Sequence, residues 1–243
     1  MILEAALNGA RSRAEQPALP ISARELAQAV AEAVAAGADV IHFHVRAMDG
    51  RESLGAGDVA RTLEAIREAA PATPLGISTG AWIVPEAPAR LLAIGSWAVM
   101  PDFASVNFVE DGAIEVARLL LNRKVGVEAG VSDLRAAEVL GASGLASRCL
   151  RVLIEPQEKE LGNALRTAAS IEAALDRAGI VLPRILHGVD RTAWRLFDEA
   201  VARGYDARIG LEDTLILPEG GLAEGNAALV AAACDRIREA ASR

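Results

Sequence analysis

The stretch Val40-Ile-His-Phe-His-Val-Arg46 combines the pattern of a β-strand with an unusual pair of polar side chains. Apolar residues alternate with His42, His44 and Arg46, and successive side chains of a strand point to opposite faces. The two imidazoles therefore project the same way, as in one half of a metal site. A half-buried strand whose polar face carries histidine fits the same pattern, so the stretch alone leaves both interpretations open.

Outward from this stretch, short apolar runs alternate with longer amphipathic, alanine-rich segments along the chain. The expected strands are Ile2–Leu7, Asp39–Val45, Pro74–Ser78, Phe103–Asn107, Val125–Glu128, Cys149–Ile154, Pro183–His187 and Ala207–Ile209. The expected helices are Ser22–Gly37, one that ends near Ala70, Pro85–Ile94, Gly112–Leu121, one capped by Ser132 that runs to about Leu140, Asn163–Ala178, Arg191–Arg203 and Leu222–Ala241. Ser22 and Glu25 have the spacing of a capping box.

This order of about eight strand-then-helix units predicts an α/β protein with a parallel sheet covered by helices. Eight units over residues 1–243 match a single-domain (β/α)8 TIM barrel. A doubly wound open sheet is the alternative, but no glycine fingerprint follows the first strand, which counts against it.

Composition narrows the classes of partner. Hydrophobic residues make up 52% of the chain and are interspersed with charge, so a sizeable core is expected. The net charge of −8 argues against a nucleic-acid-binding surface and against an anionic membrane partner. Cys149 and Cys234 lack metal-ligand spacing and indicate no disulfide framework, so we expect a cytoplasmic protein. No apolar run is long enough for a membrane span, and Met1–Leu7 does not have the pattern of a signal peptide.

Polar residues gather where the expected strands end, which in barrel enzymes is the catalytic face. They are Asn8, His42, His44, Ser78, Thr79, Gly80, Ser105, Asn107, Glu128, Glu155, His187, Arg208, Glu212 and Asp213. Glu212 follows the eighth strand, which neighbours the first in a closed barrel. Two imidazoles and this carboxylate suit a catalytic Zn²⁺ with open positions for substrate. His187 competes as third ligand, although it equally fits a substrate-contacting or core histidine.

Four motifs in this order resemble the β-keto acid cleavage enzymes, the family of the 3-keto-5-aminohexanoate cleavage enzyme. They are Asn8-Gly-Ala, Ile41-His-Phe-His-Val-Arg46, Ile77-Ser-Thr-Gly80 and Arg208-Ile-Gly-Leu-Glu-Asp213. Ala223-Glu224-Gly225-Asn226 is a weaker likeness near the end. The resemblance implies a zinc-dependent barrel enzyme that condenses a β-keto acid with acetyl-CoA and releases acetoacetate and a new acyl-CoA. We also expect a homo-oligomer, a dimer or a tetramer.

The resemblance also implies roles for individual residues. His42, His44 and Glu212 would bind zinc, and Arg208, Asp213 and Glu128 would form a polar triad that generates the nucleophile. The implied substrate-binding residues are Asn8, Ser78, Thr79, Gly80, Ser105 and Asn107. Zinc would act as a Lewis acid, Asp213 would move a proton, and the Ser78–Gly80 turn would stabilise negative charge. Without the resemblance, an ion pair at the barrel rim and an ordinary βα turn explain these last two motifs.

Two residues depart from the family pattern. Arg11 stands where members that use amine substrates carry a glutamate, and this inverted charge favours an acidic substrate, such as β-ketoglutarate or β-ketoadipate, or a neutral one. Arg11 facing the phosphates of CoA or solvent is the alternative. His187, where members often have a small residue, would line the substrate pocket.

Two other functions compete with acyl exchange. One is a different metal-dependent barrel lyase or hydrolase that turns over without CoA. The other is a non-catalytic barrel that binds a metal or a small acid.

Overall fold

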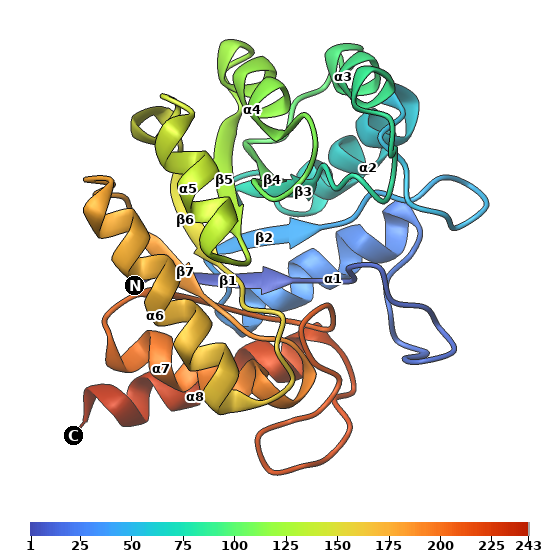
Figure 1. The fold of residues 1–243 in the computed structure, drawn as a ribbon. Coiled ribbons are helices and arrows are strands. Elements are labelled where there is room, and N and C mark those ends of the chain that lie inside the picture. The colour runs from blue at the N-terminus through green and yellow to red at the C-terminus, as the bar shows by residue number, and fades with distance from the viewer. Residues whose placement is uncertain (243) are drawn as a thin grey trace.

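Eight parallel strands close into a barrel in the computed structural model, which describes residues 1–242 (Figure 1). The strands are β1 Leu3–Ala6, β2 Val40–Phe43, β3 Leu75–Ser78, β4 Phe103–Asn107, β5 Gly126–Val131, β6 Arg151–Ile154, β7 Arg184–Leu186 and β8 Asp206–Ile209. Each strand pairs with the next in the chain, and β8 pairs with β1. This topology confirms the predicted barrel and shows that the alternative of an open sheet is wrong.

A helix follows every strand, and the helices form a ring outside the barrel (Figure 1). They are α1 Ala23–Ala36, α2 Ala56–Ala69, α3 Ala87–Gly95, α4 Ala113–Asn122, α5 Leu134–Ala142, α6 Leu161–Arg177, α7 Ala193–Ala202 and α8 Asn226–Ala241. The predicted capping box is confirmed, because Ser22 accepts a hydrogen bond from the Glu25 amide and the Glu25 side chain accepts from the Ser22 amide.

Several predicted boundaries were wrong, and β2 ends at Phe43, two residues before the predicted Val45, so His44 lies just after the strand. Asp133, not Ser132, caps α5, because its carboxylate accepts a hydrogen bond from the Ala136 amide at 2.7 Å. Strand β5 continues to Val131 because β4 and β6 pair with it along this length, so Glu128 lies in mid-strand. Helix α8 begins only at Asn226, since Leu222 is still engaged in a bridge with Ile216.

The barrel separates apolar from polar side chains across each strand. In β2, Ile41 and Phe43 are buried in the hydrophobic core under the helices, while His42, between them in sequence, points inward. Charged inward residues include Glu4, Glu128 and Arg151, and all three are at least 96% buried. A barrel interior this polar is unusual for a purely structural core. Its charged side chains lie beneath the polar residues at the C-terminal ends of the strands, where barrel enzymes carry their active sites. Within residues 1–242, the structure contains no helix with both the length and the apolar character required for a membrane span.

Candidate metal centre and active site

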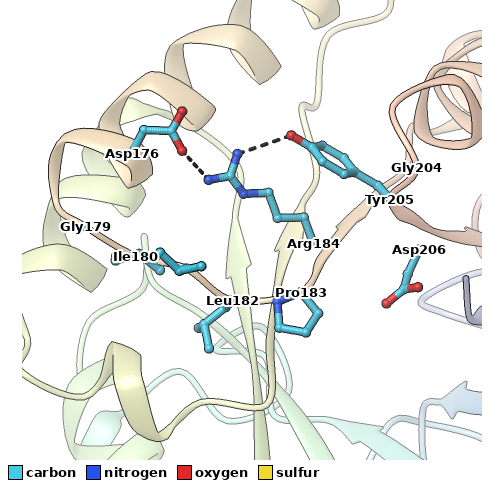
Figure 2. A pocket seen from close by; sticks show the side chains of 10 residues that line it. Asp176, Gly179, Ile180, Leu182, Pro183, Arg184, Gly204, Tyr205 and Asp206 are labelled. Atoms are coloured by element: carbon cyan, nitrogen blue, oxygen red, sulfur yellow. Dashed lines mark hydrogen bonds and ion pairs between the residues drawn. The ribbon is translucent and has the colours of Figure 1, made fainter.

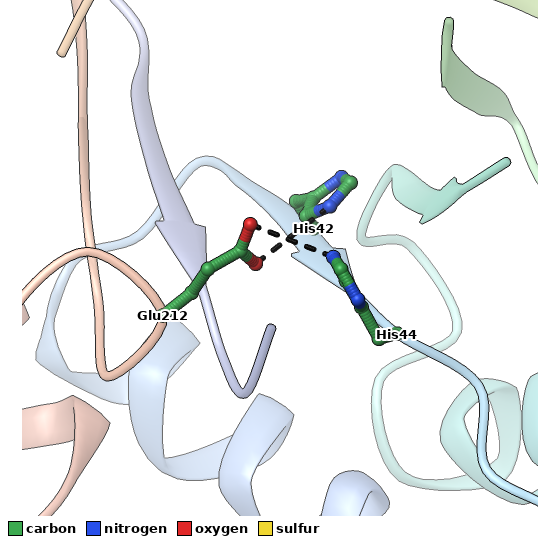
Figure 3. Close-up of side chains that lie close together, drawn as sticks. All are labelled: His42, His44 and Glu212. Atoms are coloured by element: carbon green, nitrogen blue, oxygen red, sulfur yellow. Dashed lines mark ion pairs between the residues drawn. The ribbon is translucent and has the colours of Figure 1, made fainter. Parts of the chain in front are cut away.

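The two histidines of the opening stretch meet Glu212 at the C-terminal end of the barrel (Figure 3). Glu212 lies 3.8 Å from His42 between Oε2 and Nε2, and 3.5 Å from His44 between Oε1 and Nε2. One potential ligand atom from each residue lies within 4.8 Å of the other two. The structure thus brings the three predicted ligands together. Among the described residues, His187 belongs to no such group with His42 and His44.

The closure between β1 and β8 makes this meeting possible. Glu212 follows β8, and its amide donates to the carbonyl of Ala6 in β1 at 3.2 Å. Gly9, after β1, has a φ of +53° and passes so close to Glu212 that a Cβ would lie 2.4 Å from the Glu212 Cγ. The side-chain amide of Asn8 both accepts from the His44 amide at 2.8 Å and donates to the His44 carbonyl at 3.0 Å. Asn8 therefore holds the backbone of one predicted ligand.

Two residues that sequence reasoning missed surround the other side of His44. Its Nδ1 lies 2.5 Å from Oε1 of Glu52, in the loop between β2 and α2. The indole Nε1 of Trp82 donates to the same carboxylate, and the indole ring stacks on the imidazole with centroids 5.9 Å apart. Both residues lie in loops without periodicity. Only their position after β2 and β3, at the catalytic face, could have indicated them.

Electrostatics distinguish the two imidazoles. Burial lowers the pKa of His42 to about 4, so its ring is neutral at neutral pH. Burial also lowers the pKa of His44, but the carboxylates of Glu212 and Glu52 outweigh it and raise the pKa to about 9. Burial by itself would raise the pKa of Glu212, yet Arg208 and the imidazoles hold it well below its usual range. The two carboxylates thus favour the protonated form of His44, whereas burial keeps His42 neutral.

Arg208 organises the carboxylates next to this cluster. Its guanidinium donates to Glu212 Oε1 at 2.6 Å and to Asp213 Oδ1 at 2.9 Å. His187 approaches Asp213 from another side, at 3.3 Å from Nδ1 to Oδ1, and lies 3.6 Å from Glu155. Asp213 is fully buried. Burial would raise its pKa, but Arg208 and His187 lower it overall, so Asp213 is held in its ionised form.

The third member of the predicted triad makes different contacts. Glu128 Oε2 accepts from Arg151 Nε at 2.6 Å, and Glu4 Oε2 accepts from the same guanidinium at 2.6 Å. Glu128 also lies within 4.8 Å of His42, in a group with Glu4. No hydrogen bond or ion pair joins Glu128 to Arg208 or Asp213 among the described residues, because its mid-strand position in β5 directs it to Arg151 of β6.

The predicted substrate-binding turn after β3 is mostly buried. The hydroxyl of Thr79 donates to the Ser105 carbonyl at 2.7 Å, and Ser78 Oγ accepts from the Gly80 amide at 3.3 Å. Ser78 and Ser105 are 5% and 8% exposed. Asn107 borders the open cavity directly. Of these residues, Asn107 thus lines the cavity, while Thr79 ties β3 to β4.

A cavity of about 580 Å³ lies above the candidate metal centre. Its lining includes Arg11, His44, Trp82, Asn107, Glu110, Glu155, His187, Arg208, Glu212 and Asp213. Arg11 donates to Asp190 at 2.6 Å and to the Glu212 carbonyl at 3.1 Å, and it lies 3.5 Å from Glu15. The structure therefore places Arg11 and His187 at one cavity with His44 and Glu212 of the candidate metal centre.

A second hollow lies at the opposite end of the barrel, where β7 and β8 begin (Figure 2). Its main charged group, Arg184, is already paired with Asp176 and donates to the Tyr205 hydroxyl at 3.2 Å. Of the described residues, none near this hollow belongs to a group suited to hold a metal. The chemistry is therefore concentrated at the C-terminal face.

Comparisons with known proteins relate the chain to one enzyme family. A model of the beta-keto acid cleavage enzyme family matches residues 1–141 and 162–243. The 3-keto-5-aminohexanoate cleavage enzyme of Fusobacterium nucleatum is 25% identical over 95% of this chain and 88% of its own length. The 3-oxoadipate:acetyl-CoA acetyltransferase of Cupriavidus necator is 38% identical over 80 residues, which are 32% of this chain and 28% of that protein.

Solved structures support the fold. A ternary complex of ObcA with a C4-CoA adduct and oxalate superimposes with a TM-score of 0.71 and 17% sequence identity. The match covers 92% of this chain and 64% of that one, so this chain spans less than two thirds of the ObcA chain. Since the family model matches most of the sequence, the chain belongs to the beta-keto acid cleavage enzyme family and is an enzyme rather than a non-catalytic barrel.

Proposed function

We propose that the enzyme holds a zinc ion with His42, His44 and Glu212 and exchanges acyl groups between a β-keto acid and acetyl-CoA. The acetyl group would join the two-carbon carboxyl end of the substrate as acetoacetate, and the rest of the substrate would leave as a new acyl-CoA. The observation that carries this proposal is that His42, His44 and Glu212 come together, and that His44 and Glu212 border one cavity with the Arg208–Asp213 pair. The names of two relatives, a β-keto acid cleavage enzyme and an acetyl-CoA acetyltransferase, support it.

The donor set fits zinc. A tetrahedral zinc site with bonds of about 2.1 Å separates its ligand atoms by about 3.4 Å. The separations here are of the same order: Oε1 of Glu212 lies 3.5 Å from His44 Nε2, and its Oε2 lies 3.8 Å from His42 Nε2. In addition, Oε2 of Glu212 is buried without a hydrogen-bond partner, which is costly unless a cation or donor satisfies it. When bound, zinc would act as a Lewis acid toward the keto and carboxylate oxygens of the substrate.

Asp213 is the proposed base. The carbon between the keto and carboxyl groups must lose a proton before it can attack a thioester, and an ionised carboxylate at the cavity wall can take it. Arg208 holds Asp213 in place through Nη2 and keeps it ionised. Because Arg208 also binds Glu212, one guanidinium sets the position of the base relative to that of a metal ligand.

The remaining predicted residues surround this centre, and two of them, Glu128 and Thr79, are given roles other than the predicted ones. Asn107 would donate to a substrate oxygen from the cavity wall. Ser78, Gly80 and Ser105 would bind a small oxygen at the base of the site, with Thr79 holding the turn. Glu128, through its proximity to His42, would act on the charge of the centre rather than on Arg208.

The reaction is tested by mixing purified enzyme, acetyl-CoA and a panel of β-keto acids and measuring acetoacetate. We expect acetoacetate only when acetyl-CoA is present, and a 10²–10⁴-fold lower kcat for Asp213→Asn with zinc still bound, since general base catalysis contributes about this much. Turnover without acetyl-CoA would instead support a metal-dependent lyase or hydrolase.

For the substrate, we propose an acidic distal end, with a neutral one as the alternative. Arg11 borders the cavity, and its partner Asp190 is 62% exposed, so this ion pair contributes little and a substrate carboxylate can replace Asp190. The two lining carboxylates on the other side are engaged, Glu110 with Asn107 and the Ala81 amide, and Glu155 with His187. The local identity to a 3-oxoadipate enzyme supports the acidic alternative.

The variant Arg11→Met tests this preference. We expect kcat/KM for β-ketoadipate to fall at least tenfold relative to that for a neutral β-keto acid of equal length. Arg13→Met is the matched control, because Arg13 lies in the same loop but pairs with Glu25 away from this cavity. An unchanged ranking of the two substrates in Arg11→Met would contradict an acidic substrate and favour the neutral one.

A further inference from the structure

Glu52 holds His44 from the side opposite Glu212. The Glu52 Oε1 lies 2.5 Å from His44 Nδ1, while His44 Nε2 faces Glu212 at 3.5 Å. Glu52 is brought back to this position because Arg46 and Glu52 form an antiparallel bridge and the Ser53 amide donates to the Val45 carbonyl at 2.9 Å. The loop after β2 thus folds over its own strand and returns a carboxylate to the second histidine.

Trp82 in turn holds Glu52. Its Nε1 donates to both carboxylate oxygens of Glu52 at 3.1 Å, and its ring stacks on His44 at an angle of 24°. The indole has space because residue 80 is glycine: a Cβ there would lie 2.3 Å from the indole ring. Although it makes these contacts, Trp82 is 51% exposed, which is high for so large an aromatic side chain.

The arrangement treats the two histidines differently. A carboxylate at Nδ1 of His44 holds the hydrogen on that nitrogen, so Nε2, which faces Glu212, is the nitrogen left to bind a metal ion. By contrast, Nδ1 of His42 is buried without a hydrogen-bond partner among the described residues. The orientation of His44 therefore depends on Glu52, whereas that of His42 depends on the strand that carries it.

We propose that Glu52 is a positioning residue that fixes His44 as an Nε2 ligand, and that Trp82 fixes Glu52. Because the indole stacks on His44, its fluorescence should change when a metal ion binds. This inference rests on the proposed metal site, but it is independent of which β-keto acid is used. It assigns a function to the exposed tryptophan and to Gly80 as the residue that makes room for it.

The direct test is zinc affinity, measured on the full chain by competition with a chromophoric chelator after metal removal. We expect Glu52→Ala to weaken zinc binding by 10- to 100-fold, the usual cost of losing such a partner. Glu52→Gln, which still offers an oxygen to Nδ1, should lose less. Asp49→Asn is the matched control: it removes a carboxylate from the same loop that pairs only with Arg51, and we expect wild-type affinity.

Tryptophan fluorescence gives a second readout, which uses proteins in which His42, His44, Glu212 and Glu52 are all unchanged. Zinc should change the emission of the wild-type protein, and Trp82→Phe should abolish this change while Trp194→Phe, on α7, retains it. The Phe variant keeps a ring over His44 but loses the donor to Glu52, so we expect zinc affinity to fall severalfold. Circular dichroism of each variant verifies the fold.

Equal zinc affinity of Glu52→Ala and wild type, or an equal loss in Asp49→Asn, would overturn the inference. A wild-type chain that forms acetoacetate but binds no zinc would contradict the metal site and this inference with it. Zinc binding that depends on Glu52 in a chain that forms no acetoacetate would leave the inference intact and contradict only the proposed reaction.

Discussion

His187 is a buried histidine whose charge is set by its neighbours. Its ring is 2% exposed and lies between Asp213 and Glu155, with Arg208 on the far side of Asp213. Burial and Arg208 lower its pKa, but Asp213 and Glu155 outweigh them and raise it to about 9. Because the pKa of the folded state exceeds that of the unfolded chain, about 6.5, His187 stabilises the fold fully below pH 6.5.

This stabilisation should be lost as the pH rises from about 6.5 through about 9. We expect the free energy of unfolding of zinc-saturated wild type to decrease by about 1 to 3 kcal/mol more over this range than that of His187→Gln. Urea unfolding at several pH values measures the difference. Parallel pH profiles of the two proteins would show that His187 is neutral in the folded state.

At the scale of single residues, the sequence indicated the candidate metal ligands better than it indicated the residues that hold those ligands in position. His42 and His44 were predictable because strand periodicity puts both on one face, and Glu212 because a closed barrel brings the last strand to the first. Glu52 and Trp82 were not, since loop residues have no periodicity. The contact of Glu128 with Arg151 was not predictable either, because it depends on how far β5 extends.

At the scale of elements, Gly210 joins the end of β8 to β1. A Cβ on Gly210 would lie 1.9 Å from the Ala6 carbonyl oxygen, a backbone atom that cannot move without shifting β1. The carbonyl of Gly210 accepts from the amides of Asp213 and Thr214, so it also begins the turn that carries Glu212. The glycine of the Arg-x-Gly-x-Glu-Asp motif is thus required by the close approach of two strands.

The variant Gly210→Ala should therefore damage stability and metal binding together. We expect a loss on the order of 3 kcal/mol in the free energy of unfolding and weaker zinc binding, because overpacking here displaces the turn before Glu212. Gly57→Ala is the control, since the space around Gly57 in α2 is open, and it should be neutral or slightly stabilising. Chemical denaturation of both variants measures their free energies of unfolding. Similar stability of the two would mean that β1 and β8 accommodate the methyl group.

Helices and strands were predictable where alternation of apolar and polar residues is long and regular, as for α1 with its capping box. Errors fell where local signals compete. Ser132 and Asp133 are both good capping residues, and only the tertiary path of the chain selects Asp133. Towards the end of β5, Ala129 and Gly130 are small residues of low strand propensity, and pairing with both neighbouring strands overrides that preference.

At the scale of the whole molecule, the site exists only when the barrel is closed. His44 and Glu212 lie far apart in sequence and meet through pairing of β1 with β2 and with β8. A ligand that binds only this closed state stabilises it by an amount that grows with the ratio of its concentration to its dissociation constant. The expected homo-oligomer stays a prediction. Because the melting temperature of an oligomer depends on protein concentration, melting temperatures must be compared at one concentration.

Removal of the metal should lower the melting temperature of the whole barrel. With free zinc at about 1,000 times its dissociation constant, the stabilisation is about 4 kcal/mol, which corresponds to an increase of about 8 to 16 °C for a domain of this size. Calorimetry with zinc and with a chelator measures the shift, and His44→Ala should abolish it, because two of three ligands are a poor site. Asp213→Asn, which removes the proposed base but no ligand, should retain it. An active wild-type protein with the same melting temperature in both conditions would show that the cluster of His42, His44 and Glu212 works without a metal ion.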